Sequence, residues 1–280
     1  MRPVLHDLGG QGPLVLVSHA TGFHGRAYAP LVSRLVELVR VVALDLPGHG
    51  ANPLADGEAM RVLDLAPVVA EAVGSLPEQP HLFGHSVGAA VALLAATHRP
   101  GLLASAFVFE PAVFPAGPPD ASEGRRNAVA GARRRTEVFA SRAEALARFA
   151  GRGPLAELNA GSLAAYVEHG VEDQPDGTVR LRCRRDTEAA VYETCAELTV
   201  ELLAPPGLRA TLAFGERSAP ATTDRQTDLL ARIPHARSLS IPGVGHLGPL
   251  EHPPSVATAL LDHLVWVGAL DHHPDPLPAC

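Results

Sequence analysis

The stretch His81-Leu82-Phe83-Gly84-His85-Ser86-Val87-Gly88 decides the fold, because in it a short apolar run leads directly into the pattern Gly-x-Ser-x-Gly. A stretch of helical period, Val87 to Ala96, follows at once, so the serine lies between a predicted strand and a predicted helix. Such a sharp turn needs small residues on both sides and pushes the serine hydroxyl outward. We predict a nucleophile elbow with Ser86 at its tip; the alternative is a glycine-rich turn that only packs a helix on a sheet.

Short apolar runs that end in Gly, Pro, Asp or His alternate with stretches of helical period along most of the chain. This alternation is typical of βαβ units around a parallel sheet. The sequence therefore predicts the α/β class, with a mostly parallel central sheet flanked by helices. The predicted strands are 14–17, 41–44, 81–83, 106–109, 211–214 and 238–241, and the predicted helices are 28–39, 62–73, 87–96, 226–231 and 256–267.

The fourth and fifth predicted strands are separated by far more chain than one crossover helix needs. We expect a core domain formed by residues 1–114 and 207–280, and an inserted helical cap at 115–206 over the sheet edge where ligands bind in open α/β folds. The insertion is rich in Arg and Ala and mostly helical in period. Its charge runs, Arg133-Arg134-Arg135 and Arg184-Arg185, are expected to face water.

Composition limits the classes of protein to consider. The chain has 280 residues, 46% hydrophobic and 19% charged, with a formal net charge of −7. These values are typical of a globular enzyme, and the negative charge opposes binding to a phosphate backbone, so we expect no nucleic-acid partner. All 23 basic residues are Arg, which indicates a GC-rich bacterial genome.

Several features indicate a soluble protein without a metal. The first residues contain no apolar signal segment, and no later run is long enough to span a membrane, so we expect a cytoplasmic location. Cys183, Cys195 and Cys280 lack metal spacing and are expected to be free thiols in a reducing compartment. The tail around His272-His273 is interpreted as a loose terminus.

Three further segments accompany the elbow: Ser18 to Phe23 after the first strand, Asp45 to Gly50 after the second, and Gly243-Val244-Gly245-His246 after the last. With them the chain resembles the α/β-hydrolase family over nearly all of its length outside the insertion. The resemblance implies a serine nucleophile, Ser86, and a general base, His246, from the loop after the final strand. His49, His85 and His252 have structural interpretations in a turn, in the elbow and before a helix.

Acyl transfer also needs two N–H donors for the oxyanion. Val87 supplies one at a helix N-terminus, where the dipole favours negative charge. The resemblance places the second at Thr21, although Ala20 replaces the family's usual Gly, so Gly22 and Phe23 are alternatives.

The acid of the triad departs from the family's commonest pattern. In most relatives an Asp follows the penultimate strand, but this chain has Gly215-Glu216-Arg217-Ser218 there. Haloalkane dehalogenases and a lactonase branch carry the acid at the end of the strand after the nucleophile helix, where this chain has Glu110. We favour Glu110 over Glu216 and Asp224; the alternative is that Glu110 caps a helix or loop at the hinge of the insertion.

These residues predict a serine hydrolase that cleaves a carboxylic ester or lactone of a largely apolar small molecule through an acyl-enzyme, without a cofactor. C–C bond hydrolysis and cofactor-free perhydrolysis use the same triad and stay open. A ligand-binding protein with little turnover is a further alternative, favoured if Glu110 does not contact His246. Four aromatic residues of the insertion are expected in its core rather than in the pocket wall: Phe139, Phe149, Tyr166 and Tyr192. The oligomeric state is not predicted.

Overall fold

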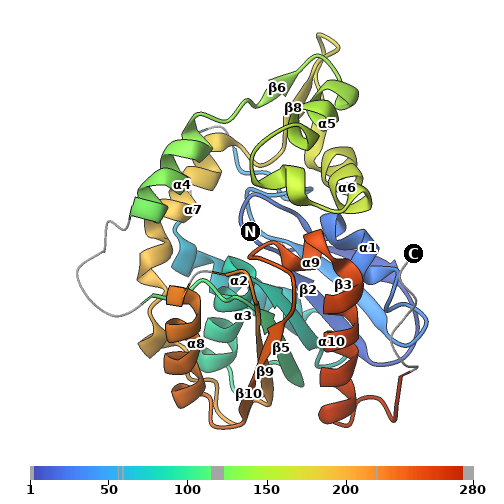
Figure 1. The fold of residues 1–280 in the computed structure, drawn as a ribbon, viewed down its shortest axis with the longest axis vertical. Coiled ribbons are helices and arrows are strands. Elements are labelled where there is room, and N and C mark those ends of the chain that lie inside the picture. Colours follow the sequence, from blue (N-terminus) through green and yellow to red (C-terminus); the bar gives the residue numbers. More distant parts are fainter. Residues whose placement is uncertain (1–2, 56, 59, 115–122, 219, 274–280) are drawn as a thin grey trace.

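A seven-stranded, mostly parallel sheet forms the centre of the molecule (Figure 1). The computed structural model describes residues 3–55, 57–58, 60–114, 123–218 and 220–273. In spatial order the strands are β1 (Val4–Gly9), β3 (Arg40–Asp45), β2 (Leu14–Ser18), β4 (His81–His85), β5 (Ser105–Phe109), β9 (Ala210–Gly215) and β10 (Ala236–Ile241). The six predicted strands pair in parallel, so the predicted fold class is confirmed.

The seventh strand, β1, was not predicted from the sequence. It pairs antiparallel with β3 at the edge of the sheet, from Val4 opposite Asp45 to Gly9 opposite Val41, with a shift of register between Asp7 and Gly9. Its residues are half-buried or exposed, because an edge strand has only one neighbour. A short stretch with two polar residues among apolar ones does not reach the continuous hydrophobicity of a central parallel strand.

Helices cover both faces of this sheet, and the buried apolar residues form two clusters. One apolar cluster includes residues of α2 (Leu65–Gly74), α3 (Val87–His98) and α8 (Pro220–Arg232). The other includes residues of α1 (Ala29–Val32), α9 (Gly248–Glu251) and α10 (Pro253–Trp266). The predicted helix 28–39 was wrong in extent: a 3-10 turn at Gly25–Tyr28 precedes the four-residue α1, and successive turns follow. Another 3-10 turn, Val62–Asp64, leads into α2.

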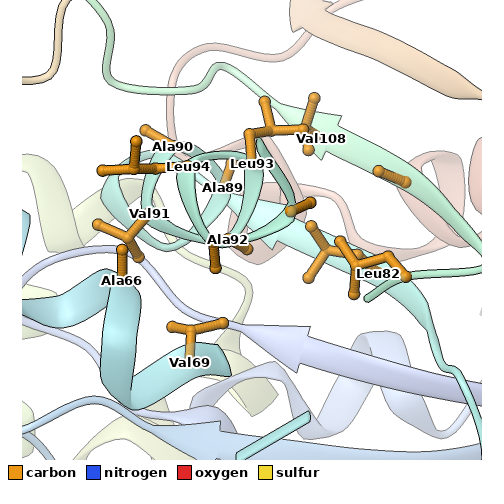
Figure 2. Close-up of a cluster of buried hydrophobic side chains, with 14 of the residues drawn as sticks. Ala66, Val69, Leu82, Ala89, Ala90, Val91, Ala92, Leu93, Leu94 and Val108 are labelled. Atoms are coloured by element: carbon orange, nitrogen blue, oxygen red, sulfur yellow. The ribbon is translucent and has the colours of Figure 1, made fainter. Parts of the chain in front are cut away.

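Helix α3, which begins directly after Ser86, is packed on all sides. Figure 2 shows Ala89 to Leu94 of this helix between Ala66 and Val69 of α2 and the strand residues Leu82 and Val108. All residues from Val87 to Ala96 are buried, and the many alanines let the helix approach its neighbours closely. Each fully buried Val or Leu contributes about 1.5–3 kcal/mol, so the elbow is attached to one of the most constrained helices of the fold.

Residues 123–194, which lie between β5 and β9 in the chain, form a layer above the sheet (Figure 1). Its helices include α4 and α7, which lie side by side, and α5 and α6, which lie next to a small antiparallel sheet with the order β6-β8-β7. The insertion was expected to be mostly helical in period, and it contains this small sheet besides its helices. The elements are α4 (Glu123–Arg133), β6 (Val138–Phe139), α5 (Arg142–Ala150), α6 (Ala160–Gly170), β7 (Val171–Asp173), β8 (Val179–Leu181) and α7 (Arg185–Thr194), with 3-10 turns at Pro154–Glu157, Cys195–Glu197 and Val200–Leu202.

The prediction that the arginine runs face water was wrong for Arg135. Arg133 and Arg134 are exposed, but the Arg135 guanidinium lies 2.6 Å from Oε2 of the buried Glu188 and also donates to the Tyr166 hydroxyl. It lies over the Phe149 ring, 5.5 Å from the centroid. Arg135 lies just beyond the end of α4, and the sequence of a charge run does not reveal which member turns inward to meet a buried partner.

The two cysteines that the structure describes, Cys183 and Cys195, are buried free thiols, whereas Cys280 lies outside the described residues. Within the described ranges, no three His, Cys, Asp or Glu side chains gather closely enough to hold a metal ion. No helix among these residues combines the length and hydropathy needed to cross a bilayer.

Candidate active site

Ser86 occupies a strained turn between β4 and α3. Its φ of 53° and ψ of −122° lie in a region that residues with a Cβ rarely adopt. A Cβ added to Gly88 would lie 2.5 Å from the Ser18 carbonyl oxygen, and one added to Gly84 would lie 2.7 Å from the Ala89 Cα. Both flanking positions therefore require glycine, which is the physical reason for the Gly-x-Ser-x-Gly pattern.

His246 lies on the loop between β10 and α9, and its side chain is half exposed. Its Nδ1 lies 2.7 Å from Oε2 of Glu110, so the Nδ1–H donates to the carboxylate. This hydrogen bond fixes the ring orientation and leaves Nε2 as the nitrogen that can take a proton. Ser86, Glu110 and His246 line the same cavity.

Glu110 follows the last residue of β5 and is 4% exposed. Its other oxygen, Oε1, accepts the Gly215 N–H at 2.9 Å and the Ser218 hydroxyl. Burial disfavours the ionised carboxyl, but the hydrogen bonds from His246, Ser218 and Gly215 outweigh it and hold the pKa of Glu110 below its ordinary value. The carboxylate is therefore ionised at neutral pH and able to orient an imidazole.

The alternative acids lie elsewhere. Glu216 is exposed, and its Oε2 accepts the Gly243 N–H at 2.9 Å. Asp224 is exposed on α8. Ser218, which stands where most relatives have their acid, donates to Glu110 instead. The contact between Glu110 and His246 also means that the condition favouring a ligand-binding protein is not met.

The predicted oxyanion donors come from two segments. The Val87 N–H lies in the first turn of α3, where the helix itself offers no acceptor. In the other segment the Phe23 N–H donates to the Ala20 carbonyl at 3.1 Å. Thr21 is buried, and its Oγ1 has no hydrogen-bond partner among the described residues. The Phe23 N–H is therefore occupied within the turn, and Thr21 stays the predicted donor with Gly22 as the alternative.

A chain of hydrogen bonds connects the elements that carry the site. The Ala20 N–H donates to the Tyr28 hydroxyl at 3.2 Å, Tyr28 donates to Nδ1 of His85 at 2.6 Å, and Nε2–H of His85 donates to the His246 carbonyl at 2.9 Å. Burial lowers the pKa of His85 to about 3, so its ring is neutral and can both accept and donate in this way. Sequence reasoning placed His85 in the elbow, but gave no signal for this link.

The remaining histidines named from the sequence lie outside the cavity wall. His49 is buried and hydrogen-bonds to the Pro47 carbonyl at 3.0 Å, and His252 lies 2.8 Å from the Ser255 hydroxyl. His19, in the predicted oxyanion segment, accepts the Leu46 N–H at 2.9 Å and donates to the Ala20 carbonyl at 2.8 Å. The hydrogen bond from Leu46 holds this segment against the turn after β3.

The cavity has a volume of ≈ 280 Å³. Its wall combines the elbow with residues of α8 and of the inserted α4 and α7. Tyr192 lines it, contrary to the expectation that the insertion's aromatics lie only in a core, whereas Phe139, Phe149 and Tyr166 are packed in the second core cluster. Besides Ser86, Glu110 and His246, the lining residues are Val87, Pro111, Ala112, Val113, Phe114, Gly124, Arg125, Ala128, Tyr192, Cys195, Arg225, Gln226 and Leu229.

Comparisons with known proteins agree with this architecture. Residues 14–259 match the model of the alpha/beta hydrolase family. A pimeloyl-[acyl-carrier protein] methyl ester esterase of Xanthomonas campestris pv. campestris is 30% identical over 268 residues, which cover 91% of this chain and 96% of that protein. A second esterase of that description, from Methylococcus capsulatus, is 39% identical over 99 residues, covering 35% of this chain and 37% of the relative.

Among solved structures, E-2-(acetamidomethylene)succinate hydrolase is similar with a TM-score of 0.77 and 23% identity, covering 93% of this chain and 94% of the other. The thioesterase domain from the curacin biosynthetic pathway is similar with a TM-score of 0.73 and 22% identity, covering 92% and 94%. At these identities the two structures establish a shared fold.

Proposed function

Since the chain belongs to the alpha/beta hydrolase family and is an ester-hydrolysing enzyme, we propose that it is a serine hydrolase in which Ser86, His246 and Glu110 form the catalytic triad. The observation that carries the proposal is the 2.7 Å hydrogen bond between Nδ1 of His246 and Glu110, in a cavity that Ser86 also lines. An alcohol is a poor nucleophile at neutral pH and needs such an oriented base.

In the proposed reaction the Ser86 hydroxyl attacks the ester carbonyl while Nε2 of His246 takes its proton. The N–H groups of Val87 and Thr21 stabilise the oxyanion of the tetrahedral intermediate. His246 then returns the proton to the leaving alcohol, and an acyl group remains on Ser86. Water, activated by His246, releases the acid. Throughout, Glu110 stays ionised and stabilises the imidazolium.

We propose that residues 115–206 form a cap over the site and that 1–114 and 207–280 form the core domain. Gly124, Arg125 and Ala128 of α4 and Tyr192 of α7 contribute to the cavity wall, so the insertion encloses the substrate from above. Enclosure excludes water and strengthens the electrostatic interactions of the triad.

The proposed substrate is a small carboxylic ester. The relatives' description names the methyl ester of a pimeloyl group on acyl-carrier protein, and a volume of ≈ 280 Å³ lies near the lower end of the range for small-molecule sites. Lactones remain alternative substrates of the same triad. The buried free thiols Cys183 and Cys195 support a reducing, cytoplasmic location.

The proposal is tested by measuring hydrolysis of short p-nitrophenyl esters and of γ- and δ-lactones. We expect hydrolysis by the wild-type protein and a loss of about 10⁴-fold or more in kcat for Ser86→Ala. A Ser33→Ala variant, which changes an exposed serine, controls for the loss of a hydroxyl. Hydrolysis by Ser86→Ala at the wild-type rate would refute the assignment.

A further inference from the structure

One wall of the cavity contains polar groups that the proposed chemistry does not use. Gln226 is 4% exposed, and neither its Oε1 nor its Nε2 has a hydrogen-bond partner among the described residues. A buried amide without partners loses its hydrogen bonds to water and gains none in exchange, which is unfavourable. Gln226 lines the cavity, so a bound molecule can supply the missing partners.

Two arginines line the cavity together with this amide. Arg225 precedes Gln226 on α8, and Arg125 comes from α4 of the insertion. The Arg225 guanidinium lies 5.1 Å from the centroid of the Phe114 ring, a contact that orients the group and leaves its positive charge in place. This wall therefore contains two cationic side chains and one amide.

Among the described lining residues, the cations outnumber the carboxylates. Glu110 is the one carboxylate among the described lining residues, and it accepts hydrogen bonds from His246, Gly215 and Ser218. The two arginine charges also act on the thiol of Cys195, another lining residue, where they oppose the rise in pKa that burial causes. Their positive potential thus extends into the cavity.

The following inference rests on the proposed function. We propose that the natural substrate is an ester with a free carboxylate at the end remote from the scissile bond. Arg225, Arg125 and Gln226 bind this carboxylate. Guanidinium groups match a carboxylate in geometry and charge, and Nε2–H of Gln226 adds a donor. The apolar lining residues Val113, Ala128 and Leu229 accommodate the carbon chain between the two ends.

The cavity volume fits a short half-ester of a dicarboxylic acid. At ~30 Å³ for each water-sized group, the ≈ 280 Å³ cavity holds a molecule of about the size of monomethyl glutarate. The test therefore compares monomethyl glutarate with methyl pentanoate, in which a methyl group replaces the carboxylate. We expect kcat/KM to be at least about tenfold higher for the anionic ester, with most of the difference in KM.

Substitutions identify the groups that produce this preference. For Arg225→Gln and Gln226→Met, the ratio of kcat/KM for the anionic ester to that for the neutral ester should fall about tenfold. The matched control is Arg232→Gln, which removes one charge from the same helix at a residue whose guanidinium donates to the Glu201 carbonyl; its ratio should equal that of wild type. No preference in the wild type, or a preference that survives both substitutions, overturns the inference.

A binding measurement separates this inference from the proposed catalysis. Calorimetry with monomethyl glutarate on Ser86→Ala should show binding that weakens about tenfold when Arg225→Gln is added. Arg225-dependent binding without any ester hydrolysis by the wild type would support the carboxylate subsite and refute the serine-hydrolase proposal. Hydrolysis of both esters at equal rates, with no Arg225-dependent binding, would refute the subsite alone.

Discussion

Glu110 and His246 are 136 residues apart in the chain, yet Oε2 of Glu110 lies 2.7 Å from Nδ1 of His246. Glu110 has a φ of 45°, and among the described residues only Ser86, with a φ of 53°, is another non-glycine residue in this region. Such conformations cost about 1–3 kcal/mol each and persist where the surrounding structure enforces them. The strained backbone thus coincides with the two predicted catalytic residues that directly follow the adjacent strands β4 and β5.

The role of Glu110 is tested by Glu110→Gln. The amide cannot stabilise an imidazolium, so we expect kcat to fall by about 10³- to 10⁴-fold. The control is Glu216→Gln, which changes an exposed carboxylate that accepts the Gly243 N–H and should retain wild-type activity. Full activity of Glu110→Gln together with a large loss in Glu216→Gln would mean that the acid was wrongly assigned.

The glycine after Ser86 gives a prediction about stability. Gly88→Ala should destabilise the protein by about 1–3 kcal/mol or more, because the new Cβ would meet the Ser18 carbonyl 2.5 Å away in rigid backbone. Urea denaturation measures the effect. Gly131→Ala is the matched control in α4: a Cβ there meets nothing within 4 Å, so we expect a gain of about 0.5–1 kcal/mol. An equal effect of both substitutions would contradict the close-packed elbow.

The central sheet was predictable because parallel strands buried on both faces form continuous apolar runs. The edge strand β1 lacks such a run, and β6, β7 and β8 have only two or three residues each, too few for a period to be recognised. The helix predicted at 28–39 failed because apolar residues at helical spacing also suit the successive turns that α1 leads into. The spacing of apolar residues alone does not distinguish a helix from a series of turns, and it does not reveal very short or half-exposed strands.

The candidate site was predictable where a residue's place follows from a strand end. Ser86, Glu110 and His246 each come after a strand of the sheet, and parallel strands end at one edge. Their catalytic roles, with those of Thr21 and Val87, stay predictions. Gln226 and Arg225 gave no such signal, because polar residues on a helix usually face water, and only the tertiary structure turns them toward the cavity.

The buried ion pair of the insertion gives a further prediction. Arg135→Met should destabilise the protein by about 3–5 kcal/mol, because it leaves the carboxylate of Glu188 buried without its partner. Adding Glu188→Gln should recover part of the loss. The exposed neighbour Arg134 provides the control, since Arg134→Met is expected to change stability by less than about 0.5 kcal/mol. Similar small effects at both positions would show that Arg135 is solvated.

Buried histidines should make the protein less stable in acid. Burial lowers the pKa of His19, His24, His85 and His263 to about 3, below the ordinary value of about 6.5. Between these values the unfolded chain binds more protons, so stability falls as the pH decreases, by about 1.4 kcal/mol per pH unit for each histidine.

The variant His263→Gln isolates one of these contributions. His263 is hydrogen-bonded to Ser105 and Thr211 at 2.8 Å each, and its removal should reduce the pH slope of the unfolding free energy between about pH 4 and pH 6 by about 1.4 kcal/mol per unit. His252→Gln, at an exposed position, serves as the control. An unchanged slope in His263→Gln would mean that His263 is protonated in the folded protein.

The most direct test of the catalytic proposal is to label the protein with a serine-reactive fluorophosphonate and to locate the adduct by peptide mass spectrometry. We predict one adduct, on Ser86, that forms at least about a hundredfold more slowly when His246 is replaced by Gln. Labelling that persists in Ser86→Ala, or an adduct on another serine of the wild-type protein, would contradict it.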